Sequence, residues 1–145
     1  MNSICKILTF GLLCSAAEGP ADLAGFAGKT PFEKVEGYRL LEVPHVRDVL
    51  GRHGAELSLL DAMDAGTDIA LRGDTLLVGL CDRDACAETN AALALALDGG
   101  LVALCTFEAP GPSAWKGPLL KKKSAAGPCP QEPDAFMNVY AGMRE

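Results

Sequence analysis

The segment from Cys81 to Cys86 is the part of the sequence whose residue types and spacing best suit chemistry. The two cysteines enclose four residues, of which three are charged: Asp82, Arg83, Asp84 and Ala85. In an oxidising compartment the two thiols would close a small rigid ring that presents these side chains at a fixed place. A ring this short removes little entropy from the unfolded chain. It therefore suits insertion into another protein's pocket better than stabilisation of a fold, and we predict a partner-binding loop.

No other pattern in the sequence predicts catalysis or a cofactor. There is no Gly-rich phosphate loop, no Ser-His-Asp arrangement that we can justify and no closely spaced pair of histidine ligands. Asp82 and Asp84 are of the residue type that glycosidases use as a pair of catalytic carboxylates. Alternate residues of a tight exposed loop point apart and are both solvated, so we do not expect them to act as such a pair. His45 and His53 flank one predicted helix and are expected at the surface. We expect no catalytic residue, no metal site and no cofactor.

The start of the chain predicts export. A short apolar run from Ile7 to Leu13 is followed by small residues that end at Ala17, as in a signal peptide. We therefore predict a signal peptide over residues 1–17 and a periplasmic or secreted protein. The run is too short to cross a bilayer, which needs about 20 residues. The alternative is a lipoprotein anchored through Cys14, although Leu13 is a poor residue at the preceding position.

The cysteines that remain after cleavage predict two disulfides. An even number of cysteines in an exported chain favours pairing, and four of them allow three connectivities: Cys81, Cys86, Cys105 and Cys129. The short spacing favours Cys81–Cys86, which leaves Cys105–Cys129 to tie the C-terminal segment to the sheet. In the loop-entropy model the first bridge is worth about 2 kcal/mol and the second about 3 kcal/mol. A four-cysteine zinc site lacks the paired short spacings of zinc ribbons, and Cys-x-x-Cys, the spacing of thiol exchange, is absent.

The charge of the chain limits its partners. Without the signal peptide the sequence has 19 acidic and 12 basic residues. Such a surface repels nucleic acid and anionic membranes, so we expect neither as a partner, and no membrane contact unless Cys14 is lipidated. A cationic protein would be attracted to it, although solubility alone would also account for the charge. The basic run from Lys121 to Lys123 lies among Gly, Pro, Ser and Ala and is expected to be a solvated loop.

The patterns along the chain predict an α+β fold: an antiparallel sheet of about five strands with a short helix packed on one face. Residues 18–42 are rich in Gly, Ala and Pro and are expected to be a loosely ordered lead-in. The core follows over residues 43–107 and begins with a helix from Pro44 to Arg52, which ends at Gly54. The expected strands are residues 56–60, 68–72, 75–80, 91–97 and 101–107, with turns near Asp64–Gly66, at Gly73–Asp74 and at Asp98–Gly100.

Two segments leave their structure open. Residues 84–98 are rich in alanine and also fit a helix, but Leu93, Leu95 and Leu97 recur every second residue, which favours a strand from about Asn90 onward. The C-terminal segment, residues 108–145, is dominated at first by Pro, Gly and Lys. We expect it to be irregular apart from the tether at Cys129, with Trp115 covering an edge of the core and residues 135–143 forming a short closing helix or strand.

This plan resembles a known family. A signal peptide, a short helix, three strands, Cys-x-x-x-x-Cys and a strand hairpin are also the plan of the bacterial inhibitors of vertebrate (c-type) lysozyme, the Ivy family. The resemblance runs from about Val46 to Phe107. In that family the bridged loop reads Cys-Lys-Pro-His-Asp-Cys and enters the lysozyme cleft, where its histidine engages two catalytic carboxylates. The resemblance implies a cationic c-type lysozyme as the partner and the loop between Cys81 and Cys86 as the contact.

The contents of the loop differ from the family pattern. Asp84 stands where the family has its histidine, and Ala85 where it has an aspartate. A carboxylate inserted between two carboxylates would be repelled, whereas Arg83, one position earlier, can bind a carboxylate through two hydrogen bonds. The prediction is therefore an exported protein-binding module similar to these inhibitors. The alternative is a periplasmic structural or envelope-associated domain of the same fold without inhibitory activity.

Overall fold

The computed structural model describes residues 4–8, 11–15 and 19–145 of the chain. Strands β1 (Ile4–Leu8) and β2 (Gly11–Ser15) form an antiparallel hairpin that pairs with no other strand. The expected cleavage site after Ala17 lies outside the described residues. Within these ranges, no helix has the length and apolar content that a membrane span would need.

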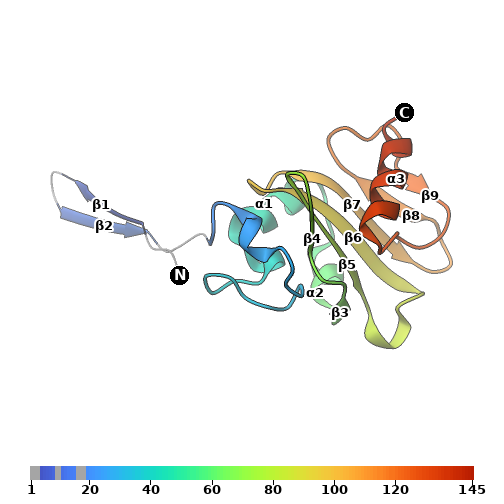
Figure 1. Cartoon of the computed structure of the whole chain (residues 1–145), viewed down its shortest axis with the longest axis horizontal. Coiled ribbons are helices and arrows are strands. Elements are labelled where there is room, and N and C mark those ends of the chain that lie inside the picture. The colour runs from blue at the N-terminus through green and yellow to red at the C-terminus, as the bar shows by residue number, and fades with distance from the viewer. Residues whose placement is uncertain (1–3, 9–10, 16–18) are drawn as a thin grey trace.

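The rest of the described chain is built on one antiparallel seven-stranded sheet (Figure 1). Its order is β3-β5-β6-β7-β8-β9, and β4 pairs with β5 beside β3. The three long central strands are β5 (Thr75–Cys81), β6 (Thr89–Ala96) and β7 (Leu101–Glu108). The outer strands are short: β3 (Ala65–Gly66), β4 (Ala70–Arg72), β8 (Ser113–Lys116) and β9 (Ser124–Ala125). Every neighbouring pair of these strands is antiparallel.

The alternation of leucine and alanine in β6 gives the sheet two different faces. Successive side chains of a strand point to opposite faces, so Leu93 and Leu95 lie on one face, and Ala92 and Ala94 on the other. The register places Leu93 between Val78 of β5 and a leucine of β7. One face of the sheet is therefore rich in leucine, and the other has room for large side chains from a helix.

The leucine face is covered by the segments that precede the sheet in the chain. These are two short 3-10 helices, η1 (Leu23–Phe26) and η2 (Leu40–Glu42), and two α-helices, α1 (Pro44–Arg52) and α2 (Leu57–Asp61). They lie together on one side of the sheet in Figure 1. Leu23, Phe26, Val46 and Leu50 are fully buried in this layer. The main hydrophobic core is therefore made by N-terminal helices and the leucines of β5, β6 and β7.

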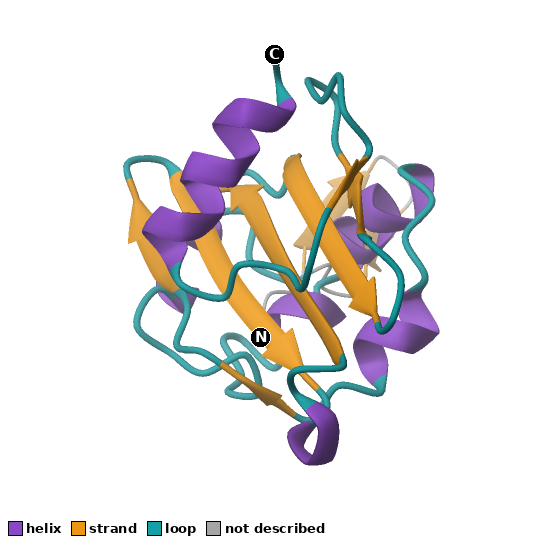
Figure 2. Ribbon diagram, turned by 90° about the vertical axis from the view of Figure 1, so that its right-hand side faces the viewer, coloured by secondary structure: helices purple, strands orange, loops and turns teal. Residues whose placement is uncertain are grey.

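The alanine face is covered by the C-terminal helix α3 (Pro133–Met143), which crosses it in Figure 2. The carboxylate of Glu132 accepts hydrogen bonds from the backbone of Asp134 and Ala135 and so begins the helix. Helical spacing then directs three large side chains at the sheet: Phe136, Tyr140 and Met143. Trp115 of β8 stacks on Phe136 with the ring centroids 5.1 Å apart. Trp115 thus closes this second core, as expected from the sequence.

Several predictions are confirmed by this architecture. The fold is an α+β antiparallel sheet, and α1 has the predicted bounds. The leucine-spaced segment is a strand, not a helix, and it forms a hairpin with β7 through a turn at Gly99, whose φ is +94°. The hairpin between β4 and β5 turns at Gly73, where φ is +61°. These confirmed elements are those with strong periodicity and a glycine at the turn.

The predicted strand at residues 56–60 is wrong, because α2 occupies this segment. Leucine favours a helix when no strand partner is available, and the outer edge of β5 is taken by β3 and β4. The helix buries Leu60, while Leu57 and Leu59 pack partly against the leucine core. The expected turn at Asp64–Gly66 is also wrong, since Ala65 and Gly66 form β3.

Three other expectations are corrected. The lead-in, residues 18–42, is not loosely packed where it is described, because Leu23, Phe26 and Leu40 are buried core residues. The segment expected to be irregular after residue 108 contributes β8 and β9 to the sheet. His53 is exposed, but His45 is half-buried against Gly99, and its Nε2 has no hydrogen-bond partner in the described part of the chain. The lead-in and the segment after residue 108 carry little periodicity, so only long-range packing orders them.

Candidate functional site

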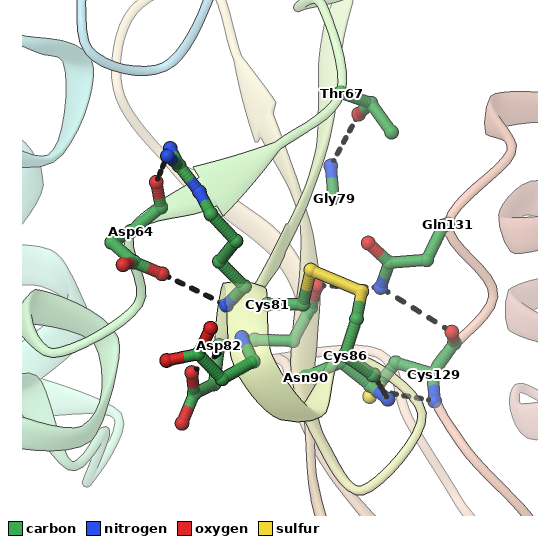
Figure 3. The surroundings of a disulfide bond; sticks show 12 residues. Asp64, Thr67, Gly79, Cys81, Asp82, Cys86, Asn90, Cys129 and Gln131 are labelled. Carbon is green, nitrogen blue, oxygen red and sulfur yellow. Dashed lines mark hydrogen bonds between the residues drawn. A yellow bond between two sulfur atoms is a disulfide. The ribbon is translucent and has the colours of Figure 1, made fainter.

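The loop between β5 and β6 is closed by a disulfide between Cys81 and Cys86, as predicted (Figure 3). The Cα atoms of the two cysteines are 4.8 Å apart. Inside the ring the chain makes one 3-10 turn, η3 (Arg83–Ala85). The carboxylate of Asp82 accepts a hydrogen bond of 3.1 Å from the backbone N–H of Asp84 and so begins this turn. The ring is therefore held in a single backbone conformation by a covalent bond and a side-chain cap.

Arg83 is held from outside the ring by Asp64. The Asp64 carboxylate accepts a 2.8 Å hydrogen bond from the Arg83 backbone N–H, and the Asp64 carbonyl oxygen accepts a 3.0 Å bond from the guanidinium. The pairing of Ala65 with Cys81 in the sheet brings Asp64 to this place, and Figure 3 shows it facing the loop. Sequence reasoning missed Asp64, because its segment was expected to be a free turn.

Asn90 joins the two disulfides. Its side chain is 2 % exposed, and it lies opposite Cys81 in the register of β5 and β6. Its amide nitrogen donates a 2.8 Å hydrogen bond to the carbonyl of Cys86, and its amide oxygen accepts a 2.9 Å bond from the N–H of Cys129. The amide thus connects the end of the loop to the C-terminal segment. The only signal in the sequence was the polar side chain of Asn90 directly before the apolar run that forms the rest of β6.

The second predicted disulfide, Cys105–Cys129, anchors the C-terminal segment across the alanine face. Both cysteines are buried, and their Cα atoms are 5.8 Å apart. Next to the bridge, the side chain of Gln131 donates a 2.9 Å hydrogen bond to the carbonyl of Ala91. It packs directly over Gly79, where an added Cβ would be 2.9 Å from the Gln131 Cδ. With all four cysteines in disulfides, no thiol of this set is available to bind zinc.

The loop lies at an acidic end of the sheet. Arg83 and Asp84 are exposed, and Asp82 and Ala85 are half-buried. Glu88, directly after the ring, and Glu108, which pairs with Thr89 at the end of β7, are exposed as well. No group of three or more His, Cys, Asp or Glu side chains is arranged to hold a metal ion in the described ranges. This arrangement presents charged side chains on a rigid support.

Replacing Asn90 with alanine should loosen the connection between the loop and the C-terminal segment. The change leaves the Cys129 N–H and the Cys86 carbonyl without their partner, and an unsatisfied buried polar group costs about 1–3 kcal/mol. We expect the free energy of unfolding, measured by urea denaturation, to fall by about that amount. Hydrogen exchange should also show faster exchange of the Cys129 amide.

Thr89→Ala is the matched control, since Thr89 is the half-buried neighbour of Asn90 in the same strand. Its variant should keep the Cys129 amide protected. Unchanged protection of that amide in the Asn90→Ala variant would show that the side chain does not hold the segment.

Comparison of the chain with protein-family models, with curated proteins and with solved structures finds no match. The resemblance to the lysozyme inhibitors therefore rests on the two loop cysteines and the strands that flank them.

Proposed function

We propose that this chain is an exported protein-binding module, similar to the c-type lysozyme inhibitors, that presents the Cys81–Cys86 loop to the cleft of a partner protein. The observation that carries the proposal is the fixation of an exposed loop at independent points. These are the disulfide, the Asp82 cap, the contacts of Arg83 with Asp64 and the hydrogen bond from Asn90 to Cys86. Such fixation suits a binding role, because it lowers the entropy lost on association.

Pre-organisation of the loop would favour binding. Ordering a flexible side chain on association costs about 0.5–1.5 kcal/mol, and an unconstrained backbone adds to this loss. Here the backbone of the ring is fixed before any contact, and the guanidinium of Arg83 is already oriented by the Asp64 carbonyl. Most of the conformational entropy is therefore lost on folding and not on binding.

The charge around the loop favours a cationic partner. Asp64, Asp84, Glu88 and Glu108 are exposed at this end of the sheet, and the whole chain is acidic, with a formal net charge of −6. Opposite charges on two proteins increase the rate of association and discriminate against wrong partners. A cationic c-type lysozyme, the target that the family resemblance suggests, has this complementary charge.

Within the loop, Arg83 is the group suited to contact carboxylates in a cleft. A guanidinium has five N–H donors, and the described contacts of the Arg83 side chain use one nitrogen, on the Asp64 carbonyl. The remaining donors can bind a carboxylate of the partner while the contact with Asp64 is kept. Asp84 is exposed beside Arg83, and a partner carboxylate placed close to it would be repelled.

The same contact supports the second candidate, a periplasmic structural or envelope-associated domain. The bonds between Arg83 and Asp64 also attach the short strand β3 to the end of the loop, so they can serve the fold alone. The two functions differ in what depends on the guanidinium. In the binding module its loss weakens association, and in the structural domain it changes only local stability.

The test is an inhibition assay in which the purified mature chain is titrated against c-type and g-type lysozymes. Charged hydrogen bonds contribute about 1.5–3 kcal/mol, so Arg83→Ala should weaken inhibition by about 10-fold or more. Arg52→Ala, which removes an exposed arginine from the end of α1, should stay within about two-fold of the parent chain by the usual effect of surface changes. Absence of inhibition of both enzyme classes would reject the lysozyme target. Equal inhibition by the Arg83→Ala variant would reject the role of the loop arginine.

A further inference from the structure

A cavity of about 470 Å³ opens between the N-terminal segment, α1, α2 and β5. Its apolar lining comes from Phe32, Leu41, Leu60, Met63 and Leu80. Pockets of roughly 300–1,000 Å³ with mainly apolar walls and a few polar groups are the usual size and character of small-molecule sites. Neither the loop nor either disulfide contributes to this lining, so the cavity is a separate site.

The outer wall of the cavity is attached firmly to the sheet edge. Gly28 donates its N–H to the carbonyl of Ile69, and Ile69 donates its own to the carbonyl of Lys29, both at 2.7 Å. Pro31, which lines the cavity, packs on Gly66 of β3, where an added Cβ would lie 2.8 Å from the Pro31 Cγ. The wall is therefore held by backbone pairing and close packing, and the cavity exists before a ligand arrives.

Four charged residues line the cavity, and they differ in whether their side chains have a partner: Arg39, Glu42, Arg47 and Asp61. Arg47 binds Asp61 through two hydrogen bonds of 2.9 and 3.0 Å and also donates to the Leu41 carbonyl. The hydrogen bond to Asp61 holds the pKa of Arg47 above its ordinary value. The Glu42 carboxylate accepts a 2.9 Å hydrogen bond from the backbone N–H of Arg39. The Arg39 guanidinium alone among the four has no hydrogen bond or ion pair with the described residues.

We propose that this cavity binds a small amphipathic monocarboxylate, with its apolar body against the leucines and its carboxylate on Arg39. A free guanidinium binds a carboxylate through two parallel hydrogen bonds, and the apolar floor excludes water from the rest of the ligand. Glu42 and Asp61 line the same cavity and would repel a second negative charge, which limits the ligand to one carboxylate. The site does not depend on the proposed partner of the loop.

The test uses three ten-carbon probes below their micelle concentrations: decanoate, decanol and decyltrimethylammonium. Isothermal titration calorimetry on the purified chain should give a Kd for decanoate at least 10-fold lower than for the other two. Arg39→Gln should remove this advantage and leave decanol binding within about two-fold, as surface changes usually do. Lys34→Gln, a change of an exposed cation outside the lining, should leave all three affinities unchanged.

A second variant tests the location. Leu41 is a half-buried lining residue, so Leu41→Trp should fill the cavity and abolish binding of decanoate and decanol alike. Arg39 is exposed, so its variant should fold normally and tests the carboxylate contact even if the tryptophan disturbs the core. Equal decanoate affinity in the parent and Arg39→Gln chains, or no saturable binding of decanoate, would overturn the proposal. Neither result bears on lysozyme inhibition, because no partner protein is present in the titration.

Discussion

Phe136→Ala is expected to lower the free energy of unfolding by about 3–5 kcal/mol, the usual loss for a large aromatic side chain removed from a core. Phe136 is 2 % exposed and stacks on Trp115. The face of the sheet that α3 covers has small side chains at Ala92, Ala94 and Ala103. These small side chains cannot move to fill the space that the ring leaves. The change should therefore open a cavity and weaken the docking of α3.

Urea denaturation measures the loss of stability, and near-UV circular dichroism should show a weaker signal from Trp115, whose stacking partner is gone. Asn138→Ala is the matched control, because Asn138 is exposed on the same helix. It should change stability by no more than about 0.5 kcal/mol. A loss in Phe136→Ala as small as in this control would mean that α3 contributes little to the second core.

Replacing both Cys105 and Cys129 with alanine is expected to lower stability by about 3 kcal/mol, more than the loss of about 2 kcal/mol expected for the pair Cys81 and Cys86. The reason is the length of chain that each bond closes. Cys105 and Cys129 are 24 positions apart in the sequence, whereas Cys81 and Cys86 are five positions apart. The longer loop restricts the unfolded chain more, so its removal costs more.

The measurement is the midpoint of urea denaturation for the two double variants under non-reducing conditions. These two double variants should also separate the effect on stability from the effect on partner binding. The Cys81/Cys86 variant should lose binding to the partner of the loop and have the smaller loss of stability. The Cys105/Cys129 variant should keep that binding and have the larger loss of stability. A larger destabilisation of the Cys81/Cys86 variant would contradict the assignment of the loop bridge to local shape.

The fold was predictable where one physical signal dominated. The repeat of Leu93 and Leu95 every second residue sets a strand, because only an extended chain puts both on one face. Pro44 at a first helical turn and Gly54 with a positive φ delimit α1 as expected. For the candidate site, the even number of cysteines and their spacing predicted both disulfides. These signals are local, so the sequence displays them directly.

The parts that could not be predicted depend on contacts between distant segments. Leu57, Leu59 and Leu60 fit a strand or a helix equally well by pattern. The helix formed because β3 and β4 occupy the strand edge that this segment would have needed. Leu23 and Phe26 lie in a sequence rich in glycine and alanine, and they are buried only because the leucine face of the sheet leaves a surface to cover.

By itself the sequence determined the existence of a closed, charged loop between two strands of an acidic chain. The tertiary structure alone decided how that loop is held, since Asp64 is 19 positions from Arg83 and Cys129 is 39 positions from Asn90. The physical reason is that a disulfide needs only two nearby cysteines, which spacing can reveal. The hydrogen bonds that orient Arg83 and join the two disulfides need the register of neighbouring strands, which only the packed sheet fixes.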